Sequence, residues 1–161
     1  MVERIPLSKT GHQRLRDELQ RLQSKDRLDV VKAIEVARGH GDLKENAEYH
    51  AAKERQALIE GRIMELKDKL GRAEVINCTE VPTNRVVFGV LVSVLDLDTD
   101  EESSYRLLGS EEADVKKGSI SVTSPWGQAM IGKEEGDEVE VKTPAGVKQL
   151  EIVEISKGEM P

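Results

Sequence analysis

The 161-residue sequence predicts a two-domain α+β fold, in which a helical hairpin precedes a small α+β domain built on an antiparallel sheet. Up to residue 77, apolar residues recur at helical spacing, whereas after residue 84 they gather in short β-branched runs. Aromatic residues make up only 2% of the chain and charged residues 34%, so aliphatic stripes and sheet faces must provide the cohesion of both domains. We therefore predict a hairpin over residues 1–77, a linker over 78–84 and a globular domain over 85–161.

The hairpin needs two long helices, and each shows an apolar stripe. The first helix can start at a cap provided by Ser8 or Thr10. Its stripe consists of Leu15, Leu19 and Leu22, followed by Val30, Ile34 and Ala37. The stripe of the second helix consists of Ala52, Ile59, Ile63, Leu66, Leu70 and Ala73. The two stripes predict an antiparallel coiled coil.

Between the stripes, Gly39 and Gly41 allow the left-handed backbone angles that close a tight reversal between helices. With a rise of about 1.5 Å per residue, each arm would extend roughly 40 Å. A hairpin that is this long and thin indicates a tip that acts at a distance from the rest of the protein. From composition alone, a helical spacer or a dimerisation arm explains the same pattern.

Five strands are predicted in the second domain, over residues 86–95, 104–108, 118–123, 138–142 and 147–155, the last two forming a hairpin. A short helix over residues 110–116 interrupts them. The acidic residues 96–102 are predicted to form a solvated loop.

The sequence contains no apolar run near the roughly 20 residues that span a bilayer, and its start lacks the apolar core of a signal peptide. We therefore expect a cytoplasmic protein without membrane contact. The single Cys78 has no partner for an intrachain disulfide, and His12, His40 and His50 lack zinc-like spacing with it.

The net charge of −7 argues against a protein whose main task is to grip duplex DNA by neutralising phosphates. Residues 1–77 carry 16 Lys and Arg against 14 Asp and Glu, whereas residues 78–161 carry 8 against 17. The acidic second half either meets a basic partner or simply keeps the protein soluble.

Asp42 and Glu45 lie at the turn of the predicted hairpin and have two interpretations. An acid followed three residues later by Glu at a helix start is a capping box, which is the common reason for this pattern. Alternatively, two carboxylates carried outward at a hairpin tip suit Mg²⁺, a hard cation often held by one or two protein carboxylates. Such a site would be weak alone and would need ligands from another macromolecule.

The tip string over residues 41–54, together with residues 37–38, 86–89, 100–106, 124–125 and 131–135, resembles the bacterial Gre family of transcript-cleavage factors, of the GreA type. The resemblance covers practically the whole chain. It implies a coiled coil that enters the secondary channel of bacterial RNA polymerase and an FKBP-like domain that docks outside.

By this resemblance, Asp42 and Glu45 are the acidic pair that coordinates Mg²⁺ in the polymerase active centre and orients the attacking water. The ion would be shared with the polymerase and not stably bound by the factor alone. The implied partners are the RNA polymerase elongation complex and the 3′ end of the nascent RNA, and we expect a monomeric cofactor that is not itself an enzyme.

Arg38 and Lys53 match basic positions of the family beside the extruded RNA, although they are equally explained as solvated charges on helix faces. Ser124 and Pro125 match a motif that contacts the polymerase, although Ser-Pro is also ordinary turn chemistry. Trp126 fits either an interface or the core of its domain.

Two other functions fit parts of the sequence less well. A channel-blocking regulator or passive adaptor is disfavoured because the chain keeps the acidic tip pattern. A peptidyl-prolyl isomerase needs an aromatic-lined pocket, for which residues 85–161 offer only Phe88, Tyr105 and Trp126.

Overall fold

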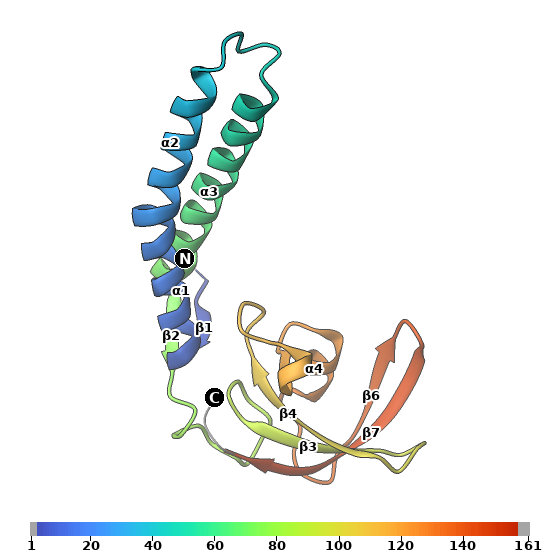
Figure 1. Cartoon of the computed structure of the whole chain (residues 1–161). Helices are drawn as coiled ribbons and strands as arrows, with labels where there is room; N and C mark the ends of the chain where they lie inside the picture. Colours follow the sequence, from blue (N-terminus) through green and yellow to red (C-terminus); the bar gives the residue numbers. More distant parts are fainter. Residues whose placement is uncertain (1–2, 158–161) are drawn as a thin grey trace. The chain divides into compact units, whose positions relative to one another are not determined.

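The computed structural model describes residues 3–157, which divide into two compact units (Figure 1). The first unit comprises residues 12–73. The second unit comprises residues 3–11 together with residues 74–157. The first is a long helical hairpin and the second a sheet domain, so the predicted two-domain α+β fold is confirmed.

The first arm of the hairpin is helical from Lys9 to Arg38, with one irregular turn. It consists of α1 (Lys9–Arg21), a π-helical segment (Leu22–Asp26) and α2 (Arg27–Arg38). Of the two predicted caps, Ser8 is the one observed, since its Oγ accepts a hydrogen bond from the Gly11 amide at 3.0 Å. In a heptad repeat, equivalent seam positions two helical turns apart are seven residues apart, but Val30 follows Leu22 by eight residues. The π segment absorbs the extra residue, and both side chains are buried.

The second arm is α3 (Ala47–Gly71), which runs antiparallel to α2. The buried seam between the two arms is formed by aliphatic side chains of both, namely Leu22, Val30, Ile34, Ala37, Ala52, Ile59, Ile63 and Leu66. Two bidentate ion pairs cross between the arms, Arg27 with Glu60 at 2.8 and 2.9 Å, and Arg62 with Glu18 at 2.9 and 3.1 Å. Because both geometries require aligned side chains, these pairs help to fix the register of the hairpin.

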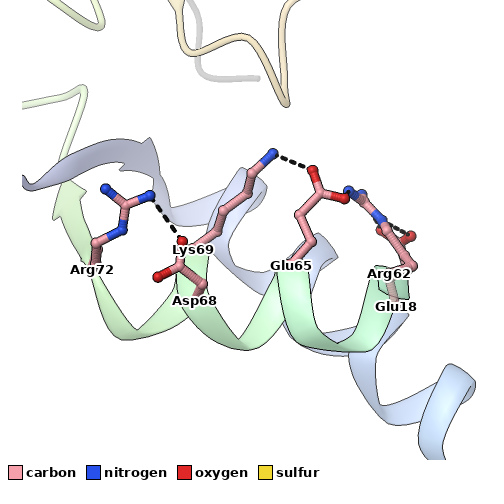
Figure 2. A network of polar contacts seen from close by, with 6 residues as sticks. All are labelled: Glu18, Arg62, Glu65, Asp68, Lys69 and Arg72. Atoms are coloured by element: carbon pink, nitrogen blue, oxygen red, sulfur yellow. Dashed lines mark hydrogen bonds and ion pairs between the residues drawn. The ribbon is translucent and has the colours of Figure 1, made fainter. Parts of the chain in front are cut away.

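Arg62 also belongs to a chain of charges along α3 (Figure 2). Its remaining guanidinium nitrogen, Nη1, lies 3.1 Å from Oε2 of Glu65, and the other oxygen of Glu65 lies 2.9 Å from Lys69 Nζ. Hydrogen bonding to Arg62 holds the pKa of the partly buried Glu18 below its usual value. The bridge therefore stabilises the fold most where Glu18 is ionised.

We expect Glu18→Gln to destabilise the hairpin by about 1 kcal/mol at neutral pH. The folded-state pKa of Glu18 is lowered from 4.5, so the bridge contributes fully above that pH and is lost as the pH falls through the folded-state pKa. Urea unfolding followed by helical circular dichroism should show a gap between variant and wild type that closes in acid. The control is Glu54→Gln, at an exposed position of α3. A gap that is constant with pH would contradict the assignment.

The second unit holds a five-stranded sheet in the order β5-β4-β3-β7-β6. Its strands are β3 (Leu91–Asp96), β4 (Glu102–Leu108), β5 (Ser119–Ser121), β6 (Glu138–Thr143) and β7 (Gly146–Ser156). All neighbours are antiparallel except β4 and β5, which are parallel. The sheet curves around the short helix α4 (Pro125–Met130), as Figure 1 shows. Aliphatic side chains fill the space between them.

A separate two-stranded sheet, which the sequence did not predict, pairs β1 (Ile5–Ser8) with β2 (Ala73–Ile76). Ser8 donates to the Glu112 carboxylate through its amide at 3.0 Å and through its hydroxyl. These contacts attach the start of the chain to the rest of the second unit.

Three predicted elements differ from the structure. The strand predicted over 86–95 begins only at Leu91, because Gly89 adopts a φ of 92° and residues 86–90 form a turn that buries Val86 and Val90. The helix predicted over 110–116 is wrong, since only the 3₁₀ turn Val115–Lys117 forms. Residues 78–84, predicted as a linker, fall within the second unit, with Cys78 and Val81 buried.

Burial raises the pKa of the Cys78 thiol, which therefore stays protonated at neutral pH.

Among the residues that the structure describes, no helix has the length and apolar character needed to cross a bilayer.

Candidate functional site at the hairpin tip

The loop between α2 and α3 carries Asp42 and Glu45, and both side chains are exposed. Gly41 adopts a φ of 113°, whereas Gly39 continues the helix with a φ of −67°. Only one of the two predicted glycines therefore supplies a left-handed angle. Asp42 accepts a hydrogen bond from the Lys44 amide at 2.9 Å, which shapes the loop locally.

The capping-box interpretation of Asp42 and Glu45 is wrong. Helix α3 begins at Ala47, and its cap is Asn46, whose Oδ1 accepts from the Tyr49 amide at 3.0 Å. Asp42 lies four residues before this cap, within the loop. Neither acid is therefore used to start the helix.

Three side chains from the first residues of α3 and its cap hold the loop. Asn46 donates through Nδ2 to the Ala37 carbonyl in the last turn of α2. His50 Nε2 lies 3.2 Å from the Lys44 carbonyl, and Glu48 lies 3.4 Å from His40. No signal in the sequence indicated that Asn46 and Glu48 brace the tip.

The acids face an open hollow of about 520 Å³ that is lined by His40, Asp42, Glu45, Asn46, Ala47 and Glu48. Carboxylate oxygens are the ligands that Mg²⁺ prefers, so this donor set fits that ion. Within residues 3–157, no group of three or more His, Cys, Asp or Glu side chains is arranged to hold a metal. Asp42 and Glu45 therefore do not belong to a complete metal-binding group among the described residues.

Arg38 and Lys53 flank the tip loop. Arg38 is the last residue of α2, and Lys53 lies in the second turn of α3, where its Nζ is 3.3 Å from Gln56 Oε1. Both side chains are exposed, so the structure places one cation on each arm close to the acids along the chain.

Ser124 and Pro125 start helix α4 in the second unit. Ser124 Oγ accepts from the Gly127 amide at 3.1 Å and donates to the Ser121 carbonyl at 2.6 Å, so it has a local structural role. Pro125 occupies the first turn and is exposed.

Trp126 is half-buried and packs against the core of the second unit, which is the core alternative considered above. Its ring meets Tyr105 edge to face at 5.7 Å between centroids, and Lys148 Nζ lies 5.7 Å from its centroid. These contacts fix the Trp126 ring on the sheet.

Comparison with known proteins covers both units. Residues 5–75 match the family described as "Transcription elongation factor, N-terminal", and residues 81–157 match "Transcription elongation factor, GreA/GreB, C-term". The chain is 66% identical over 159 residues to "Transcription elongation factor GreA" of Desulfotalea psychrophila, with 99% of both chains covered. It is 53% identical over 154 residues to the protein of that name from Hyphomonas neptunium, covering 96% of this chain and 98% of the relative.

Among solved structures, the chain is similar to GreA factor homolog 1 (Gfh1) of Thermus thermophilus, with 28% identity and a TM-score of 0.44. That match covers 95% of this chain and 99% of the other. The two family matches together span nearly all the described residues, and the identities to the relatives are high over their full lengths. The chain therefore belongs to the GreA/GreB family of transcription elongation factors.

Proposed function

We propose that this elongation factor binds bacterial RNA polymerase in the cytoplasm and stimulates cleavage of backtracked nascent RNA by the polymerase's own active centre. In this proposal the hairpin enters the secondary channel and delivers Asp42 and Glu45. The observation that carries the proposal is that both acids are exposed on a braced loop and neither caps α3. Their placement calls for an explanation other than helix stability.

The two carboxylates would hold Mg²⁺ together with ligands from the polymerase, because the tip alone offers an incomplete shell. When bound, the ion supplies the positive charge that activates water and stabilises the leaving oxygen in phosphodiester hydrolysis. Asp42 and Glu45 would also accept hydrogen bonds from the attacking water and so orient it.

Arg38 and Lys53 would lie along the 3′ segment of the displaced RNA. Both are exposed cations beside the tip, and contacts of this kind fix the position of a nucleic acid without reading its sequence. The second unit would dock outside the channel through the exposed Pro125 and the turn that Ser124 caps. One copy of the chain would act on one polymerase.

The test adds the purified protein to stalled, backtracked elongation complexes with Mg²⁺, and to the same RNA without polymerase. We expect shortened RNA and renewed extension in the complexes, and no cleavage of the RNA alone, because the tip lacks the ligands of a complete metal site. Unchanged RNA in the complexes would refute the proposal. Degradation of naked RNA would show instead that the protein is a nuclease in its own right.

A further inference from the structure

We propose that Asn46 is a positioning residue, which holds the two tip acids in a fixed arrangement by linking the two arms of the hairpin. This inference rests on the proposed cleavage function. It concerns a side chain that bears no charge, and that reaches the metal-binding acids only through the loop.

The Asn46 amide has two separate tasks. Its oxygen accepts from the Tyr49 amide and starts α3, while its nitrogen donates to the Ala37 carbonyl at the end of α2. The same carbonyl accepts from the His40 amide at 3.1 Å. One side chain therefore joins the last turn of one arm to the first turn of the other.

The loop that this link closes contains only residues 38–45, including both acids. Glu45 directly precedes Asn46, so holding Asn46 restricts where the backbone of Glu45 can lie. Asp42 is held from within the loop by its bond to the Lys44 amide, and the Lys44 carbonyl lies against His50. The two other braces involve exposed side chains, whereas Asn46 is half-buried. A half-buried hydrogen bond meets less competition from water, so Asn46 is the main constraint.

No other common capping residue can do both tasks. Asp and Ser cap a helix about as well as Asn. The Asp carboxylate has no donor for the Ala37 carbonyl and would repel it. The Ser hydroxyl can accept and donate at once, but its one oxygen stands a bond closer to the backbone than the two separate atoms of the Asn amide, so it cannot cap Tyr49 and also reach the Ala37 carbonyl. Substitution by Ser or Asp therefore separates loop positioning from helix capping.

The experiment compares Asn46→Ser and Asn46→Asp with wild type in cleavage of backtracked RNA across a range of Mg²⁺ concentrations. We expect the Mg²⁺ concentration for half-maximal cleavage to rise about tenfold in both variants, which is the lower end of the cost of losing a residue that orients metal ligands. Competition with wild type for the polymerase and the helical circular dichroism should stay unchanged. Agreement between the neutral and the charged variant excludes an effect of added charge.

Relaxation of the backbone amides, measured by NMR on the protein without polymerase, tests the same inference independently of cleavage. We expect order parameters of residues 41–45 to fall in Asn46→Ser and to remain as in wild type in the control Lys44→Ala, which keeps both contacts of Asn46. Wild-type Mg²⁺ dependence in both Asn46 variants, or an unchanged loop, would overturn the inference while leaving the proposed function intact. If the wild-type protein itself stimulates no cleavage, the proposed function fails and this inference fails with it.

Discussion

Asp42→Asn and Glu45→Gln should each lower stimulated RNA cleavage by on the order of a hundredfold or more, because a hard dication strongly prefers carboxylate to carboxamide. The fold should not change. Both side chains are exposed and neither caps α3, and such surface substitutions usually alter stability by less than about 0.5 kcal/mol. The Asn side chain can still accept from the Lys44 amide.

The assay is cleavage of backtracked complexes, combined with competition against the wild-type protein. Because the variants keep their fold and their docking surface, they should occupy the polymerase and inhibit the wild-type factor. Glu35→Gln is the matched control, since it neutralises an exposed acid on α2 away from the tip and should cleave normally. Full cleavage by the double variant of Asp42 and Glu45 would show that the acids are not metal ligands.

Gly127→Ala should destabilise the second unit by about 3 kcal/mol, at the upper end of the usual cost of forcing an extra methyl into a packed interior. A Cβ at this position would lie 2.1 Å from the Ser121 carbonyl oxygen and 2.8 Å from Val122 Cα. Both atoms belong to the backbone, so they cannot move aside as a side chain can. Helix α4 would have to separate from the strand beneath it.

The measurement is urea unfolding followed by the fluorescence of Trp126, the single tryptophan of the chain, which lies in α4 itself. The control is Gly61→Ala, where a Cβ meets no atom within 4 Å on the exposed side of α3. That substitution should stabilise the hairpin by about 0.5–1 kcal/mol, because alanine loses less backbone entropy in a helix. A wild-type midpoint for Gly127→Ala would mean that α4 is not closely packed.

The hairpin was predictable because its apolar stripes repeat over many helical turns. A different secondary structure or register would expose the whole stripe to water. The exposure of Asp42 and Glu45 followed from the same pattern. The sequence did not show that neither acid caps α3. Asp and Asn are both good helix caps, so only the backbone geometry decides between Asp42 and Asn46.

The second unit was harder to predict where short-range signals are weak. Helix α4 has only six residues, including Pro125 and Gly127, and it depends on the Ser124 cap and on close packing. Strands β1 and β2 have four residues each and are far apart in sequence, so their pairing is a tertiary effect. Val86 and Val90 are buried without forming a strand, which periodicity cannot reveal.

The π-helical segment at Leu22–Asp26 relaxes, for one residue, a constraint on the length of this hairpin. Each residue added to or removed from a regular helix turns everything beyond it by about 100°, so a single insertion in one arm would swing its seam away from the other arm. The one surplus residue of this chain is tolerated because it is confined to a single wide turn. A longer or shorter hairpin would otherwise need matched steps of seven residues in both arms, each shifting the acids by about 10 Å. The distance of the acids from the base of the hairpin can thus change in large steps, while their orientation about the hairpin axis stays constant.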